Sequence, residues 1–279
     1  MAAEPEPAVE DIPQNVCSGA EGKSSLRMMA SAYYLPKENS DNNPLGQGAH
    51  FICDEQQTFG LADGVRGPDS GVYAGNFIQS AVGLVQEKPK GGVNPKQVIQ
   101  EAFLQNKGVE GSITATIITL EDDSLRALNM GDSGFRIIRD GKIVHESTTR
   151  LRGFKRPIRR RNPTGTLPPP AQEIAFNVKP GDVVVAATVG LFDNVPAEDI
   201  ELMIMTSFLD EDTPPDLAAE RLAKMARSVS SDRKNSVNGG GYGYVKIRGD
   251  KYDNVTVIVA YLYEPDASPM EIEESDITS

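Results

Sequence analysis

Residues 59–67 read Phe59-Gly-Leu-Ala-Asp63-Gly64-Val-Arg66-Gly67, and the interpretation of the whole chain starts from this stretch. A second apolar run precedes it at residues 49–53, and Asp54-Glu-Gln-Gln57 joins the two, which predicts a pair of strands. We expect Asp63-Gly64 to end the second strand. A carboxylate at the end of a buried strand, beside glycines that let ligands approach the backbone, is typical of a metal or phosphate site. Taken alone, however, Asp-Gly favours a turn.

Length and composition indicate a protein with a full hydrophobic core. The chain has 279 residues, of which 39% are hydrophobic, and this length allows one large domain or two small ones. Its formal net charge of −12 makes nucleic acid and anionic membranes unlikely partners. No apolar run approaches the roughly 20 residues that span a membrane. With 2 cysteines and 2 histidines, the chain offers neither a disulfide framework nor a histidine-rich metal site or catalytic triad.

The two ends of the chain differ in composition from its middle. Residues 1–24 show little apolar periodicity and begin acidic and proline-rich, and residues 265–279 are acidic again, so we expect both segments to be disordered. A single domain is expected at residues 25–264. The start resembles neither a secretory signal nor a basic transit peptide, which favours a cytoplasmic or nuclear protein. We expect a monomer.

Apolar periodicity predicts the elements between these ends. Alternating and β-branched runs predict strands at residues 26–34, 49–53, 59–64, 113–120, 125–129, 135–139, 142–145, 174–178, 182–187 and 255–263. Helical spacing predicts helices at residues 74–86, from Pro95 onward, and at residues 196–209 and 215–229. Strands grouped around hairpin turns, with helices inserted in pairs, indicate an α+β domain of two antiparallel sheets flanked by helices.

Four acids stand beside glycine or at predicted strand ends. They are Asp63, Asp132 in Gly131-Asp-Ser-Gly134, Asp193 in Gly190-Leu-Phe-Asp-Asn194, and Asp253 before the last strand. If they converge at one edge of a β-sandwich, their carboxylates suit Mg²⁺ or Mn²⁺, which prefer oxygen ligands. Each acid by itself is better explained as a turn or cap residue. Their order along the chain and their neighbours favour the metal site.

Six blocks of sequence occur in a fixed order. They are Ala49-His-Phe-Ile, Phe59-Gly-Leu-Ala-Asp-Gly-Val, Gly111-Ser-Ile-Thr-Ala, Asn129-Met-Gly-Asp-Ser-Gly-Phe, Gly190-Leu-Phe-Asp-Asn and Lys251-Tyr-Asp-Asn-Val-Thr-Val. In this order they resemble the protein phosphatase 2C family of metal-dependent Ser/Thr phosphatases, within its compact plant-type branch. The resemblance runs from about Met28 to Tyr263, and it implies an α–β–β–α sandwich with a metal cleft at one edge.

The resemblance also implies a mechanism and a set of ligands. In that family two Mg²⁺ or Mn²⁺ ions hold a bridging water, which attacks the phosphorus of phosphoserine or phosphothreonine in a protein substrate. By resemblance, Asp63 is the aspartate shared by both ions, Gly64 supplies a backbone carbonyl, and Asp253 is the late ligand. Asp132 and Asp193 correspond to acids that orient waters or a weaker additional ion.

This chain departs from the family at four positions within the implied site. Relatives carry Gly-Glu-Asp where this chain has Gly46-Gln47-Gly48, and Asp where it has Val189. Arg66 replaces a glycine and puts a cation where the metals are implied. Fewer negative charges around two divalent ions predict weak metal binding and weak or absent hydrolysis. Two function classes stay open: a phosphatase with a weakened site, and a pseudophosphatase that binds phosphoproteins or regulates active relatives.

The segment 150–161 contains seven basic residues, which are Arg150, Arg152, Lys155, Arg156, Arg159, Arg160 and Arg161. It suits a nuclear localisation signal or an anion-docking loop. It equally suits a solvated loop that offsets the field of neighbouring acids, and the sequence leaves both interpretations open.

Overall fold

The computed structural model describes residues 26–37, 47–66, 69–147, 171–209, 213–236 and 253–265. The predictions for the lead-in at residues 1–24, for the basic segment 150–161 and for nearly all of the acidic tail therefore lie outside the described residues. Within the described ranges, none of the helices has both the length and the apolar character that crossing a membrane requires.

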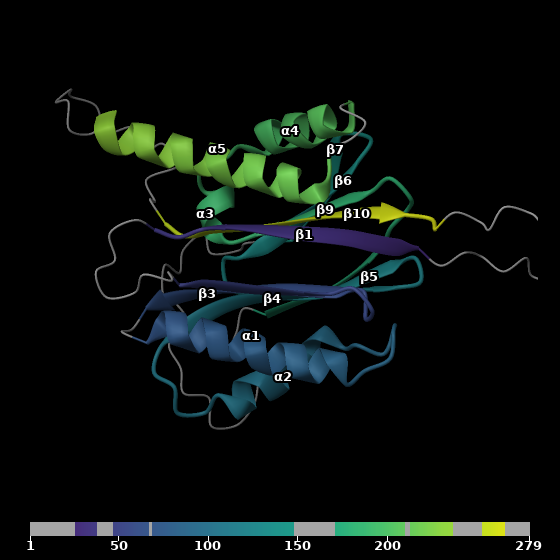
Figure 1. Cartoon of the computed structure of the whole chain (residues 1–279), viewed down its shortest axis with the longest axis vertical. Helices are drawn as coiled ribbons and strands as arrows, with labels where there is room; N and C mark the ends of the chain where they lie inside the picture. The colour runs from purple at the N-terminus through teal and green to yellow at the C-terminus, as the bar shows by residue number, and fades with distance from the viewer. Residues whose placement is uncertain are drawn as a thin grey trace, which may run out of the picture.

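Two five-stranded antiparallel sheets face each other at the centre of the domain (Figure 1). Sheet A has the order β1 (Arg27–Leu35), β10 (Val255–Tyr263), β9 (Val183–Ala187), β6 (Gly134–Arg139) and β7 (Lys142–Glu146). Sheet B has the order β2 (Gly48–Cys53), β3 (Thr58–Arg66), β4 (Ser112–Glu121), β5 (Ser124–Met130) and β8 (Ala171–Asn177). Every strand pairing recorded in either sheet is antiparallel.

Helices cover the outer face of each sheet (Figure 1). On sheet B lie α1 (Ser70–Gln86) and α2 (Pro95–Gln105), and on sheet A lie α4 (Ala197–Leu209) and α5 (Pro215–Ser236). A single short turn of helix, α3 (Val189–Phe192), follows β9. The predicted sandwich of two antiparallel sheets flanked by helices is confirmed.

Three apolar layers hold the sandwich together. Phe77 and Ile99 lie between the helices and sheet B, Phe59 and Phe135 lie between the sheets, and Leu222 lies between α5 and sheet A. Each of these side chains is 0–1% exposed. Burying one large apolar side chain contributes roughly 1.5–3 kcal/mol, so the three layers together provide the driving force that the apolar periodicity predicts.

Several element boundaries differ from the prediction. The strand expected to end at Asp63-Gly64 continues to Arg66, because Gly64 and Arg66 pair with Ile113 and Ser112 of β4, with a bulge between them. Helix α5 continues to Ser236, seven residues past the predicted end at Val229, because no helix-breaking residue intervenes. The turn α3 was not predicted, since a four-residue segment gives no periodic signal.

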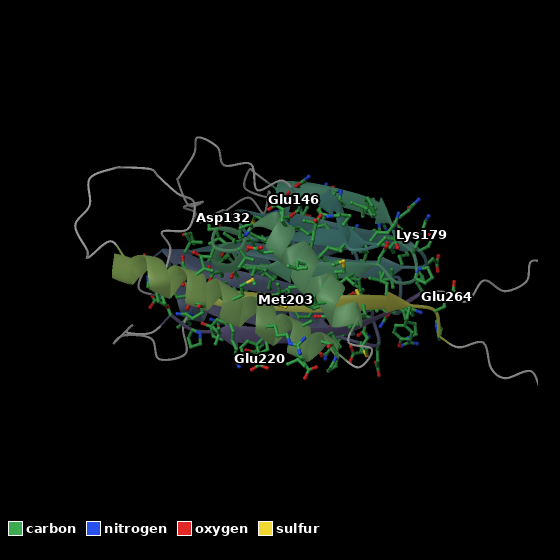
Figure 2. The ribbon with its side chains drawn as sticks, turned by 90° about the horizontal axis from the view of Figure 1, so that it is seen from above. Asp132, Glu146, Lys179, Met203, Glu220 and Glu264 are labelled. Atoms are coloured by element: carbon green, nitrogen blue, oxygen red, sulfur yellow. The ribbon has the colours of Figure 1, made fainter. Side chains whose placement is uncertain are left out.

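The sandwich has two distinct ends, which Figure 2 separates: Asp132 lies at one end, and Lys179 and Glu264 lie at the other. We call the first the Asp63 end, because Asp63 pairs there with Gly48 of β2 and Thr114 of β4. We call the second the Asp182 end.

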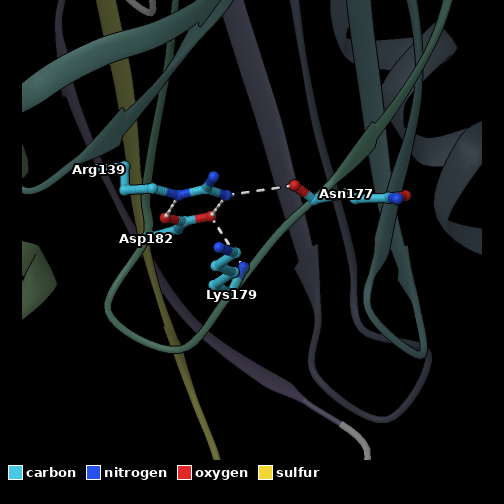
Figure 3. A network of polar contacts seen from close by, with 4 residues as sticks. All are labelled: Arg139, Asn177, Lys179 and Asp182. Atoms are coloured by element: carbon cyan, nitrogen blue, oxygen red, sulfur yellow. Dashed lines mark hydrogen bonds and ion pairs between the residues drawn. The ribbon is translucent and has the colours of Figure 1, made fainter.

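At the Asp182 end a partly buried ion pair ties the sheets together (Figure 3). Arg139 of sheet A donates from Nε and Nη2 to the carboxylate of Asp182, at 2.8 and 2.7 Å. The same Nη2 donates to the carbonyl of Asn177 in sheet B at 3.2 Å, and the Lys179 amide donates to Asp182 at 2.9 Å. The hydrogen bonds to Asp182 raise the pKa of Arg139 above its ordinary value. The fold is therefore closed at this end by a bidentate arginine.

Candidate metal centre

Strand register brings Asp63, Asp132 and Asp253 to the same end of the sandwich. In sheet A, Leu35 pairs with Val255, so Asp253 lies just before the pairing begins. Two contacts join this end of sheet A to sheet B: Tyr34 bonds the Gly48 amide, and Ser133 Oγ lies 2.6 Å from Thr114 Oγ1. Asp132 immediately precedes Ser133.

Asp63 and Gly64 lie in β3 where α1 begins. Asp63 is 5% exposed. The Gly64 amide donates to the carbonyl of Gln47 at 2.9 Å, and a Cβ on Gly64 would lie 2.5 Å from the carbonyl oxygen of Ser70. Only glycine fits so close to the first residue of α1, which explains the Asp-Gly sequence without invoking a turn.

The family resemblance implies two acids at the positions of Gln47 and Gly48, and both residues make other contacts here. The Gln47 side-chain amide donates to Ser70 Oγ at 3.0 Å. The Gly48 amide donates to the Tyr34 hydroxyl at 3.3 Å. A Cβ on Gly48 would lie 2.6 Å from Thr256 Oγ1 and 2.7 Å from Cε2 of Tyr34, so neighbouring groups occupy the space that an acid at this position needs.

Val189, where the family resemblance implies a metal-binding acid, is the first residue of α3 and is 8% exposed. The next residue, Gly190, packs against the carbonyl of Asn254, so this turn is fixed against the segment that contains Asp253. Val189 supplies an apolar side chain to this buried contact and no oxygen donor.

Asp253 is the first described residue of the last segment and lies two residues before β10. Its Oδ1 accepts a hydrogen bond from the Asn254 amide at 3.0 Å, and its carbonyl accepts one from Nη2 of Arg227 at 3.4 Å. The carbonyl of Asp253 is therefore held by α5, while one carboxylate oxygen organises the residue that follows it.

Asp132 and Asp193 occupy loops. Asp132 is half-buried and follows Gly131, whose φ of +97° is a conformation that favours glycine. Asp193 ends α3, with its amide donating to the Val189 carbonyl at 2.9 Å and its side chain exposed. Both acids therefore lie at local turns of the backbone, which is the alternative that the sequence left open for them.

The oxygen donors that remain at the implied metal positions are the carboxylates of Asp63 and Asp253 and the carbonyl of Gly64. Among the described residues, no group of three Asp, Glu, His or Cys side chains is arranged to hold a metal ion. Gln47 is bonded to Ser70, the place of a side chain at Gly48 is filled, and Val189 is apolar. This donor set does not fit a pair of divalent ions, each of which needs about six oxygen ligands.

Arg66 is described only through its backbone, which pairs with Ser112. The hypothesis that its guanidinium takes the place of a metal stays a prediction. Two residues that the sequence did not indicate, Tyr34 and Arg227, do reach this end of the sandwich. Neither residue lies in one of the six blocks. The one signal in the sequence is Gly48, because a glycine at this position leaves room for a large neighbouring side chain.

Curated relatives of the chain are protein phosphatases. It is 36% identical over 251 residues to the Probable protein phosphatase 2C 80 of Arabidopsis thaliana, and 33% identical over 249 residues to the Probable protein phosphatase 2C 55 of the same plant. These matches cover 85% of the chain but only 59% and 52% of the relatives, so the chain spans little more than half of their length. The Protein phosphatase PTC7 homolog fig of Drosophila virilis is 32% identical over 262 residues, which cover 81% of the chain and 80% of that protein.

Solved structures share the fold. The photosystem II phosphatase PBCP aligns with a TM-score of 0.68 and 23% identity, over 84% of this chain and 98% of that one. The catalytic domain of the serine/threonine protein phosphatase PstP, solved with 2 manganese ions, aligns with a TM-score of 0.59 and 18% identity, over 86% and 100%. No protein-family model matches the chain. On the 32% identity to a relative of which it covers 80%, and on this shared fold, the chain belongs to the protein phosphatase 2C family.

Proposed function

We propose that this protein binds proteins carrying phosphoserine or phosphothreonine, and that its hydrolysis of them is weak or absent. The observation that supports weak or absent hydrolysis is the packing around Gly48. An acid there would have to displace Thr256 Oγ1 and the ring of Tyr34, which would lie 2.6 and 2.7 Å from its Cβ. The loss of that acid is thus accompanied by neighbours that fill its place.

Electrostatics support the same conclusion. Relatives have acids where this chain has Gln47, Gly48 and Val189. Near a protein surface, one unit charge 4 Å from another contributes about 4 kcal/mol at an effective dielectric of about 20. A divalent pair that loses these partners loses several kcal/mol of binding free energy. In the family the metal pair supplies an activated water, and we derive no hydrolytic step from the residues present here.

A slow phosphatase is the second candidate, and one observation favours it. Asp63 and Asp253, which correspond to direct ligands in the family, are both present at the Asp63 end, and Gly64 keeps its backbone carbonyl there. The manganese ions in PstP illustrate what a related fold can bind. A single weakly held Mg²⁺ or Mn²⁺ is compatible with three such donors supplemented by water.

Two measurements on the full chain separate these candidates. Calorimetric titration with Mn²⁺ should show at most one event, in the millimolar range, and phosphopeptide turnover should stay at the level of an Asp63→Asn control. Fluorescence anisotropy should show tighter binding of a phosphoserine peptide than of the same peptide with serine.

Two Mn²⁺ sites of micromolar affinity, together with turnover that Asp63→Asn abolishes, would establish the phosphatase instead. Equal affinity for the phosphorylated and unphosphorylated peptides would remove the binding function.

A further inference from the structure

Tyr34 connects the two sheets at the Asp63 end. It lies in β1 of sheet A, opposite Thr256 of β10. Its hydroxyl accepts a hydrogen bond from the amide of Gly48, the first residue of β2 in sheet B, at 3.3 Å. It donates one to Oδ1 of Asn254, just before β10, also at 3.3 Å. One phenol therefore uses both its acceptor and its donor to join strand ends from opposite sheets.

The fit between Tyr34 and Gly48 is close. A Cβ on Gly48 would lie 2.7 Å from Cε2 of Tyr34 and 2.6 Å from Oγ1 of Thr256. Both distances are shorter than a normal van der Waals contact. The ring of Tyr34 therefore fills the space that a side chain at residue 48 would occupy. Tyr34 can reach the amide of residue 48 because that residue is glycine.

Asn254 is the second part of the connection. It is 1% exposed, and Oδ1 accepts from the Lys37 amide at 2.9 Å as well as from Tyr34. Its backbone carbonyl lies 3.4 Å from the hydroxyl of Thr188, the residue that precedes α3. Because one buried oxygen accepts two hydrogen bonds, Asn254 links the segment that follows β1 to the start of β10.

Arg227 of α5 is the third part. Its Nη2 donates to three backbone carbonyls, those of Leu35 at 3.1 Å, Pro36 at 2.7 Å and Asp253 at 3.4 Å. Leu35 and Pro36 lie at the end of β1, and Asp253 lies just before β10. A guanidinium stays charged at every physiological pH, so it can hold carbonyl groups where a metal ion would otherwise do so.

The charge state of Tyr34 suits this role. Burial raises the pKa of its hydroxyl, the Gly48 hydrogen bond opposes that rise, and the nearby Asp63 carboxylate adds to it. The hydroxyl therefore keeps its proton at neutral pH and can donate to Asn254.

We propose that Tyr34, Asn254 and Arg227 form a tie that holds the Asp63 end together without a divalent cation. The inference rests on the proposed function in one respect, namely that this end of the fold works without a metal pair. It adds that these three side chains hold the strand ends together when no ion is bound. A chelator such as EDTA should therefore leave the melting temperature of the protein unchanged.

The test compares Tyr34→Phe with Tyr263→Phe, a phenol that is 41% exposed at the other end of sheet A. In EDTA, Tyr34→Phe should melt roughly 3–8 °C below the unchanged protein, because two hydrogen bonds are lost at a partly buried junction. Tyr263→Phe should melt within about 1 °C of it. The Gly48 amide should exchange its hydrogen about tenfold faster in Tyr34→Phe, whereas the Gly64 amide, bonded to Gln47, should keep its protection.

Unchanged melting together with unchanged Gly48 exchange in Tyr34→Phe would overturn the tie. So would an unchanged protein that melts far lower in EDTA than in millimolar Mn²⁺, since its Asp63 end would then need the metal. Neither readout uses a substrate. Phosphopeptide turnover can therefore refute the proposed function while amide exchange still decides whether the tie exists.

Discussion

Gln47 and Ser70 are joined by a hydrogen bond of 3.0 Å, from the side-chain amide at the start of sheet B to the hydroxyl at the start of α1. The hydroxyl can reverse its role and donate to a carboxylate. Gln47→Glu should therefore fold normally, with a free energy of unfolding within about 1 kcal/mol of the unchanged protein in urea. Gln47→Leu, which cannot bond Ser70, is the matched control and should lose more.

Restoring the family's residues requires a change at Tyr34. The variant that combines Gln47→Glu, Gly48→Asp, Arg66→Gly and Val189→Asp should gain Mn²⁺-dependent phosphopeptide turnover only when Tyr34→Ala makes room beside residue 48. Single changes should recover little, because the ligands around one metal pair act as a unit. Mn²⁺ calorimetry and turnover of the variants with and without Tyr34→Ala measure this. Full activity from Val189→Asp alone would contradict it.

Val189→Asp should destabilise the metal-free protein. The side chain is 8% exposed, and a carboxylate buried there without a partner costs about 1–3 kcal/mol or more. Val189→Thr, similar in shape, should cost less. Urea unfolding in EDTA gives the comparison, and millimolar Mn²⁺ should recover part of the loss in Val189→Asp and none in Val189→Thr. Equal stability of the two variants in EDTA would show that Val189 is not part of the buried contact.

The ion pair at the Asp182 end should be important for stability. The Asp182 side chain is 1% exposed and that of Arg139 is 26% exposed, so Asp182→Ala leaves a partly solvated charge without its bidentate partner and should cost about 1–3 kcal/mol in urea unfolding. Glu173→Ala removes the exposed ion pair with Lys96 and should cost about 0–1 kcal/mol. Similar losses in both variants would mean that burial does not distinguish the two pairs.

His145 should make stability fall in mild acid. Its ring lies between Phe135 and Phe176, with centroids 5.7 and 5.0 Å away, and burial lowers the pKa of His145, opposed by the Glu146 carboxylate. The unfolded chain then takes up a proton before the folded one as pH falls below about 6.5. The contribution is complete above that pH and is lost as pH falls toward the lowered value.

Urea unfolding from pH 7.5 to 5 should therefore show a smaller slope in His145→Phe than in the unchanged protein. The chain has 2 histidines, and burial also lowers the pKa of His50, so His50→Gln measures the other contribution. Parallel pH curves for His145→Phe and the unchanged protein would refute the role of His145.

Much of this fold follows from local patterns in the sequence. A run of strongly β-prone residues predicts β10 at residues 255–263 with the observed bounds, and Asp140-Gly141 predicts the hairpin between β6 and β7. These features depend on neighbouring residues alone. The sequence also predicts which family positions are changed, because Gln47 and Gly48 directly precede the block that starts at Ala49, and Val189 precedes the block that starts at Gly190.

What surrounds those changed positions depended on the tertiary structure. Tyr34 and Asn254 are 220 residues apart, and they meet because β1 pairs with β10. The packing of the two sheets places the ring of Tyr34 beside Gly48, and the packing of α5 on sheet A places the guanidinium of Arg227 beside Asp253. No periodicity or motif encodes such contacts, since strand register and sheet packing are collective results of burying three apolar layers at once.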